Sequence, residues 1–320
     1  MNYIDLIYAN GYFAFMVQEY TQGSGYGRSF VVYANDPSGT WNTMQIGVSG
    51  RNYQGFKYVN GKYLTLTNYN NTTYYTDVLT FDNIGGQVTT NTILTGMGTP
   101  TYTYNIDYYD GKWYAIWFQG YSSGSSYITD TRLYYSDTLA NVYSAGQYGQ
   151  IERTSSSSGG SNYFYPENIT CGNGYYVVWG YRTLSPGQNG LLDIYYSNDL
   201  IHFTRSYMPQ YWGTRREVSV PIFFDGAFYL ATNDIAEGES RRPYIIYGAD
   251  PTNLTAKLLY NSSAYRTRLA ASETTKTLFV GGQSIGYTTL TAAWQKVGKS
   301  LPRISPGVGL NAYIKAKEGD

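Results

Sequence analysis

The sequence predicts an all-β fold, a six-bladed β-propeller of four-stranded antiparallel blades with a short C-terminal extension. Two observations predict it. A tight turn followed by an aromatic run recurs at intervals of about 50 residues, which is the length of a propeller blade. The composition agrees, because Tyr (39) and Gly (36) are abundant and only 14% of the residues are charged. No stretch shows a helical period, so almost no helix is expected.

Each unit contains two kinds of turn. The first turn pairs Asn or Asp with Gly, which accept positive φ, and so predicts a hairpin between the first and second strands. It falls at Asn10-Gly11, Asn60-Gly61, Asp110-Gly111, Asn173-Gly174 and Asp225-Gly226. The second turn carries an aspartate whose carboxylate is expected to accept hydrogen bonds from turn N–H groups. These structural turn residues are Asp36, Asp82, Asp137, Asp199 and Asp250.

The repeats predict one domain rather than several. The expected blades span residues of about 1–50, 51–100, 101–150, 162–210, 216–262 and 266–300. The last copy is degenerate, because Thr275-Lys276 stands where the tight turn is expected. A Ser-rich run, Thr154 to Ser161, predicts an exposed loop between the third and fourth units. Residues 301–320 lie outside the repeat and are expected to dock elsewhere or to close the ring as an extra strand.

The composition also narrows the possible partners. The formal net charge is zero, so no basic field favours nucleic acid, and no apolar run is long enough to span a membrane. The N-terminus lacks the features of a signal peptide. The single cysteine, Cys171, excludes an intrachain disulfide and is expected to be buried. The single histidine, His202, lies in an Asp turn and argues against a multi-histidine metal site, so no metal or cofactor is expected.

The Asp turns carry a resemblance to known families. Residues 196–203 (YSNDLIHF) resemble the Asp-box of sialidase-type propellers and the aspartate turn of five-bladed glycoside hydrolases, and residues 34–41 are a looser match. In this motif the aspartate holds the turn and the aromatic residue fills the gap between strands. The resemblance therefore implies the propeller fold and nothing direct about activity.

The loops opposite the tight turns are the expected ligand-binding face, because they are longer and more varied. They are rich in aromatic residues, which stack on sugar rings, and in arginines, which bind the carboxylates of acidic sugars. The alternative is that the aromatic rings cover surface and the arginines pair with internal acids. The predicted ligand-binding residues are Tyr163, Tyr165, Arg182, Tyr211, Trp212, Arg215, Arg216, Arg241 and Arg242.

An enzymatic alternative rests on two carboxyl groups, which glycoside hydrolysis requires. Residues 162–179 resemble an acid-bearing segment of the five-bladed hydrolases, and Glu167 matches the acid of that motif. Glu217 is the second candidate, although Ser219 occupies the place where the family pattern has its acid. Asp5 lies near the place where a base would be expected.

The C-terminal segment carries a second resemblance. Residues 301–305 and 311–317 resemble the end segments of bacteriophage tail and virion proteins. This resemblance implies a receptor-binding propeller that is made in the host cytoplasm and acts outside the cell as part of the virion. Three hypotheses follow: non-catalytic binding of a host cell-surface glycan or receptor, a glycoside hydrolase or sialidase acting on polysaccharide, and a structural virion protein that binds only other virion proteins.

Overall fold

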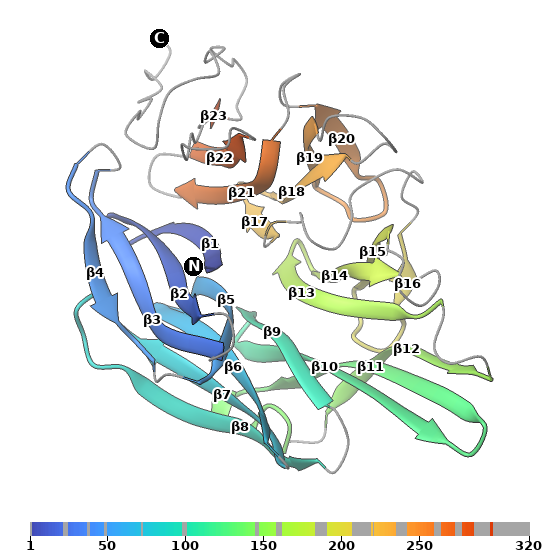
Figure 1. The fold of residues 1–320 in the computed structure, drawn as a ribbon. Coiled ribbons are helices and arrows are strands. Elements are labelled where there is room, and N and C mark those ends of the chain that lie inside the picture. The colour runs from blue at the N-terminus through green and yellow to red at the C-terminus, as the bar shows by residue number, and fades with distance from the viewer. Residues whose placement is uncertain are drawn as a thin grey trace.

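Antiparallel sheets stand around a common axis in the computed structural model (Figure 1). The structure describes residues 2–21, 25–36, 39–47, 50–71, 73–97, 101–144, 147–157, 162–182, 191–206, 219, 221–234, 242–258, 264–272, 277–284 and 295–296. In these ranges the chain forms five four-stranded blades and one three-stranded sheet, each with its strands in chain order. The first strands surround the axis, and β21 lies beside β1, so the last sheet meets the first.

The blades follow one another along the chain. Blade 1 consists of β1 (Asn2–Ala9), β2 (Tyr12–Thr21), β3 (Gly25–Ala34) and β4 (Asn42–Gln45). Blade 2 consists of β5 (Asn52–Val59), β6 (Lys62–Asn71), β7 (Thr73–Phe81) and β8 (Thr89–Met97). Blade 3 consists of β9 (Thr101–Tyr109), β10 (Lys112–Ser123), β11 (Ser126–Ser136) and β12 (Tyr148–Ser156), with a 3-10 turn, η1 (Leu139–Asn141), between the last two.

The second half of the ring has shorter strands. Blade 4 consists of β13 (Phe164–Gly172), β14 (Tyr175–Arg182), β15 (Leu191–Ser197) and β16 (Thr204–Arg205). Blade 5 consists of β17 (Ile222–Phe224), β18 (Ala227–Asp234), β19 (Arg242–Gly248) and β20 (Thr255–Leu258). The three-stranded sheet consists of β21 (Ala264–Ser272), β22 (Thr277–Ser284) and β23 (Gln295–Lys296).

The prediction of six four-stranded blades is wrong. Five blades have four strands, whereas the sixth unit pairs three strands within the described residues, and its last strand, β23, has only two residues. The first hairpin of this unit forms all the same, since β21 pairs with β22 although Thr275-Lys276 replaces the Asn-Gly or Asp-Gly pair of the other units. What the unit lacks within the described residues is a fourth strand, and its third strand pairs with β22 at only two positions. The predicted tail strand in residues 301–320 lies outside the described residues.

The five predicted tight turns are confirmed. Asn or Asp adopts a positive φ of 47° to 51° at the first position, and the following glycine adopts a φ of 74° to 79°. These angles are those of a two-residue hairpin turn whose twist matches the flanking strands. A loop over the whole run from Thr154 to Ser161 is not found, since β12 continues to Ser156 and pairs with β11 there.

The predicted role of the turn aspartates as hydrogen-bond acceptors is confirmed at Asp199 and Asp250. The carboxylate of Asp199 accepts hydrogen bonds from the backbone N–H groups of Ile201 and His202, at 2.8 Å each, and Asp250 accepts one from Thr252 N–H at 2.7 Å. His202 is exposed. Phe203 packs against blade 3, where a Cβ at Gly149 would lie 2.8 Å from its ring, so the Asp turn of one blade closes against the preceding blade.

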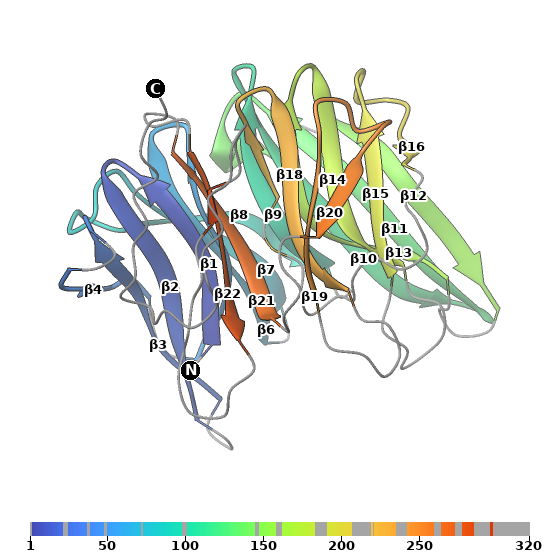
Figure 2. The same cartoon turned by 90° about the horizontal axis from the view of Figure 1, so that it is seen from above.

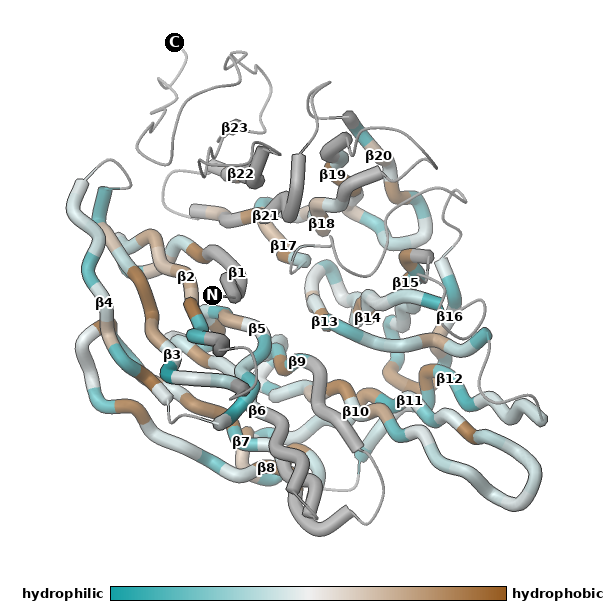
Figure 3. Tube along the Cα trace, in the orientation of Figure 1, coloured by the Kyte–Doolittle hydropathy of each residue, from teal (hydrophilic) through white to brown (hydrophobic). Residues whose placement is uncertain are grey.

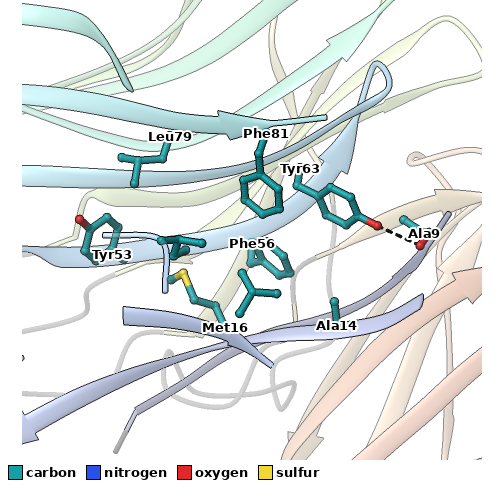
Figure 4. Packing of buried hydrophobic residues seen from close by; sticks show 10 residues of the cluster. Ala9, Ala14, Met16, Tyr53, Phe56, Tyr63, Leu79 and Phe81 are labelled. Atoms are coloured by element: carbon teal, nitrogen blue, oxygen red, sulfur yellow. Dashed lines mark hydrogen bonds between the residues drawn. The ribbon is translucent and has the colours of Figure 1, made fainter. Parts of the chain in front are cut away.

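The core lies between neighbouring blades. Figure 4 shows the contact between blades 1 and 2, where Tyr63 stacks on Phe81 with ring centroids 5.0 Å apart. The Tyr63 hydroxyl donates a hydrogen bond of 3.0 Å to the carbonyl of Ala9, and burial raises the pKa of Tyr63 to about 12. Figure 3 shows hydrophobic residues along the strands of blades 1 to 4 and a more polar tip on the β10–β11 hairpin. No helix in the described ranges is long and apolar enough to cross a membrane.

Candidate functional site

Irregular pairing recurs in the strands that surround the axis. The registers of β1, β5, β9 and β13 each shift once. The residue at the shift is Asp5 in β1, Gly55 in β5 and Glu167 in β13, and in β9 it is Asn105 together with the residue before it. We call these four positions the bulge ring. A β-bulge leaves one residue out of the ladder and re-aims its side chain, and bulges are frequent beside active sites. β1 and β13 lie on opposite sides of the axis (Figure 1), so the strands that carry the two acidic positions face one another across the ring.

Amide side chains join two members of the ring. The Nδ2 of Asn105 donates a hydrogen bond to the Oδ1 of Asn168, which follows Glu167 in β13. The Oδ1 of Asn105 accepts a hydrogen bond of 2.8 Å from the N–H of Ile106, and this contact fixes the orientation of the amide. Gly55 has a φ of 59°, which favours glycine, and a Cβ at this position would be in ordinary contact, 3.5 Å from the Nδ2 of Asn105. The half-buried Glu167 is thus held on a strand whose next residue is clamped to β9.

A buried lysine links three blades close to this ring. Lys57, on β5, is only 8% exposed. Its Nζ donates to the carbonyl of Ile169 on β13 at 2.9 Å and to the carbonyl of Ile106 on β9 at 3.4 Å. It also lies 3.8 Å from the Oδ2 of Asp107. Buried ammonium groups need hydrogen bonds and an opposite charge, and Lys57 finds these on blades 3 and 4.

The acidic and thiol groups near Lys57 are not suited to nucleophilic catalysis. Burial raises the pKa of Asp107, and the charge of Lys57 and the N–H groups of Tyr108 and Cys171 oppose this rise. Burial and the neighbouring Asp107 carboxylate raise the pKa of Cys171, which is 7% exposed in β13 as the sequence predicts. A thiol with a raised pKa stays protonated at neutral pH and is unreactive.

A row of aromatic rings runs along the boundary between blades 3 and 4. We call it the aromatic ridge, and its members are Phe118, Tyr127, Tyr163, Tyr165 and Tyr181. Tyr165 stacks on Tyr181 with centroids 4.9 Å apart, and Phe118 stacks on Tyr163 at 6.0 Å. Tyr127 lies 6.5 Å from Tyr163. The structure therefore brings the predicted ligand residues Tyr163 and Tyr165 together, on the side of the disc where β10 ends.

Arg182, the third predicted ligand residue in this region, forms ion pairs with two acidic side chains of the protein itself. Its Nε donates to Asp193 at 2.9 Å, its Nη2 donates to the Tyr195 hydroxyl at 2.7 Å, and it forms an ion pair with Glu152. The Tyr195 hydroxyl and the N–H of Phe164 both donate to Glu152. Burial and the Glu152 hydrogen bond raise the pKa of Tyr195. This network joins blades 3 and 4, so Arg182 has a structural role.

The remaining predicted site residues fall mostly outside the described residues. This applies to Tyr211, Trp212, Arg215, Arg216, Glu217 and Arg241, and to the side chain of Arg242. Ser219 is described and buried, and it pairs with β18 through a backbone N–H that donates 2.8 Å to Ala231 O. The Ser219 hydroxyl accepts a bond of 2.9 Å from Ala231 N–H. Ser219 therefore pairs with β18 through hydrogen bonds and supplies no carboxyl group at this position.

A recurrent buried aspartate was not predicted from the sequence. Asp77, Asp130 and Asp193 lie on the third strands of blades 2, 3 and 4, and each is at most 3% exposed. Their partners are Arg51, Arg132 and, for the last, Arg182 together with Arg205. The sequence contains a signal for these buried residues, because in these three units an aspartate stands a few residues before the turn aspartate. Within the described ranges, no group of three His, Cys, Asp or Glu side chains is placed to hold a metal ion.

Comparison with known proteins shows the type of fold. No protein-family model matches the sequence, and no curated protein matches it. An α-L-arabinofuranosidase of Fusarium graminearum in complex with an iminosugar inhibitor is similar, with a TM-score of 0.58 and 11% identity over 88% of this chain and 87% of that chain. The Trypanosoma rangeli sialidase gives a TM-score of 0.55 and 11% identity over 91% of this chain and 53% of its own. This chain thus spans about half the length of that sialidase.

These neighbours are β-propellers of the sialidase and glycoside hydrolase type, which agrees with the resemblance of the Asp turns. At 11% identity the likeness is one of fold, and the same fold carries different functions. None of these neighbours is a phage tail or virion protein.

Proposed function

We propose that the chain is a glycoside hydrolase that binds a saccharide over the bulge ring, with Glu167 as one of its two reacting carboxyl groups. The observation that carries the proposal is the position of Glu167, half-buried at the bulge of β13 and across the axis from the bulge of β1. The arabinofuranosidase and the sialidase that share the fold are glycoside hydrolases, which supports the same class of reaction here.

The chemistry needs a carboxylic acid to protonate the leaving oxygen and a carboxylate to act as nucleophile or base. Glu167 is held by the strand that Asn105 and Lys57 fasten, which supports a fixed geometry for its carboxyl group. Asp5 supplies the second carboxyl in this proposal, because it occupies the bulge of the opposite strand. Glu217 is the alternative second acid, from a segment outside the described residues.

The test compares Glu167→Gln and Asp5→Asn with the parent chain on a panel of aryl glycosides and soluble polysaccharides. Release of reducing ends is measured over time, and saccharide binding is measured on the same samples. We expect turnover to fall at least about 100-fold in each variant while binding is kept, since a general acid or base contributes about that much. Asp82→Asn, at an exposed Asp turn on the opposite face, is the control and keeps the parent rate. Full activity in Glu167→Gln would refute the proposal.

A non-catalytic glycan-binding module is the second candidate. It is favoured by Ser219, because the position of the family's acid is filled by a side chain engaged with Ala231. Saturable binding by the parent chain, with no release of sugar from any substrate, would support it. Recognition of a host glycan, a place in a virion and contacts with other virion proteins stay predictions. They are tested by detecting the chain in purified particles, with residues 301–320 present or removed.

A further inference from the structure

We propose that the aromatic ridge is an extended binding site for a chain of neutral sugar units, leading from the rim of the disc towards the bulge ring. The inference rests on the proposed function, because it names the kind of saccharide that reaches the same site. It goes further in assigning the binding of polymer to residues that take no part in the reaction. A substrate with several linked units would then bind better than a single sugar.

The ridge has a buried floor and a more open row above it. Phe118 and Tyr181 are each 4% exposed, whereas Tyr127, Tyr163 and Tyr165 are half-buried. The ring centroid of Tyr163 lies 6.4 Å from that of Tyr165 and 6.5 Å from that of Tyr127. The three successive rings are therefore spaced by roughly the length of one sugar unit. Aromatic faces stack on the apolar C–H faces of sugar rings. A row with this spacing suits consecutive units of one chain.

A projecting arm carries the outer end of the ridge. The β10–β11 hairpin stays paired as far as Ser123 and Ser126, and β12 pairs with β11 to Ser156, so blade 3 reaches beyond its neighbours (Figure 2). Tyr127 lies on this arm with its hydroxyl above Gly120, where a Cβ would approach within 2.4 Å of the hydroxyl oxygen. The glycine therefore lets the tyrosine ring lie on the strand instead of standing away from it.

The inner end of the ridge leads to Glu167. Tyr165 and Glu167 are two residues apart on β13, and the strand that carries them begins at the N–H of Phe164, which is held by Glu152 at 2.7 Å. A saccharide lying on Tyr163 and Tyr165 is thus placed beside the bulge that carries the proposed reacting carboxyl. The Glu152 network fixes this position, since it ties the start of β13 to Arg182 on β14.

The charges around the ridge favour neutral sugars over acidic ones. Arg182, on the strand next to Tyr165, is held between Glu152 and Asp193, with 11% of its side chain exposed. The negative charge of Glu152 is paired with Arg182 in the same network. The arm also carries the hydroxyl groups of Thr129 and Thr154, which are 2.6 Å apart, and one exposed arginine, Arg153. Hydroxyl groups and flat rings match the surface of a neutral sugar.

The test measures how binding depends on chain length. Neutral glucans, xylans, arabinans and galactans of one to eight units are titrated against Glu167→Gln, which is expected to bind without turnover. We expect affinity to rise with length up to at least three units. Tyr127→Ala and Tyr163→Ala should lower the affinity for the long chains about tenfold, and leave that for a single sugar unchanged.

Two variants guard against a trivial loss of binding. Tyr127→Leu keeps apolar packing on Gly120 but lacks the aromatic ring. It should therefore lower the affinity for long chains as Tyr127→Ala does, and it tests the ring itself if Tyr127→Ala folds poorly. Tyr148→Ala removes an exposed aromatic ring, 45% exposed, on the outer strand of blade 3 and should bind as the parent does. Affinity that does not grow with length, unchanged binding in the ridge variants, or binding to acidic chains alone would overturn the inference. Failure of the proposed function is seen separately, as sugar release by Glu167→Gln.

Discussion

Replacing Lys57 with methionine tests whether a buried charge fastens the strands around the axis. Lys57 is 8% exposed, and its ammonium group donates to carbonyls on β9 and β13 and faces the carboxylate of Asp107 at 3.8 Å. Methionine has a similar length but no charge. Removing one partner of a buried pair leaves the other charge uncompensated, which typically costs about 3–5 kcal/mol of unfolding free energy.

The assay is urea denaturation at pH 7, read from the midpoint and slope of the unfolding curve. Lys62→Met is the matched control, because the Lys62–Asp82 pair is exposed and worth about 0–1 kcal/mol. The double variant Lys57→Met with Asp107→Asn removes both charges and should recover most of the lost stability. If Lys57→Met loses no more stability than Lys62→Met, the assignment of Lys57 as the link between three blades is refuted.

The pH dependence has a definite sign. Burial raises the pKa of Asp107, and the charge of Lys57 lowers it in part, so removing Lys57 raises the folded-state pKa further. A group with a raised folded-state pKa contributes stability that is complete below its unfolded pKa and is lost as the pH rises through the folded value. The deficit of Lys57→Met should therefore be largest at neutral pH and shrink as the pH falls towards about 4.

Two further predictions concern the turns and the blade contact. The N–H and the side chain of His202 are among the groups whose hydrogen bonds hold the pKa of Asp199 far below its usual range, so Asp199→Asn should lower the melting temperature at pH 7, and the difference should shrink as the pH falls below about 4. Equal differences at pH 7 and pH 3 would contradict this. Tyr195→Phe removes a hydroxyl that donates to Glu152 and accepts from Arg182, and should cost about 1–3 kcal/mol in urea denaturation, against no change in stability if the contact were incidental.

The repeat and the hairpins could be predicted because their cause is local. The Asn10-Gly11 turn and its four counterparts need only two residues that accept positive φ, and the structure has those angles at all five. The burial of Cys171 and the exposure of His202 also follow from their places within one unit. The number of blades depends on the last unit, which repeats the first hairpin but has no fourth strand within the described residues, so the sequence pattern overestimated the number of four-stranded blades.

The function of individual arginines could not be predicted, because their partners come from other strands and other blades. Arg182 was a reasonable ligand for a carboxylate by its position in a loop-facing segment. Its partner Glu152 lies 30 residues away, on the last strand of the preceding blade. The acid that pairs with Arg182 therefore cannot be recognised from the local sequence, whereas Tyr163 and Tyr165 could be expected to lie close together, because they are two residues apart at the start of blade 4.

The role of Lys57 was also not predictable from the sequence, because its partners are even further away along the chain. In the sequence it is an ordinary charged residue near the end of a strand, of the kind that is nearly always exposed. The bulge at Gly55 and the convergence of three first strands place it against carbonyl groups 49 and 112 residues further along the chain. A propeller brings the same position of every unit to its axis, so a residue that is unusual in one unit meets backbone from others. Departures from the repeat at these positions, such as Lys57, Asn105 and Glu167, are therefore the places where function is best sought, and each can be read from the sequence once the units are aligned on their tight turns.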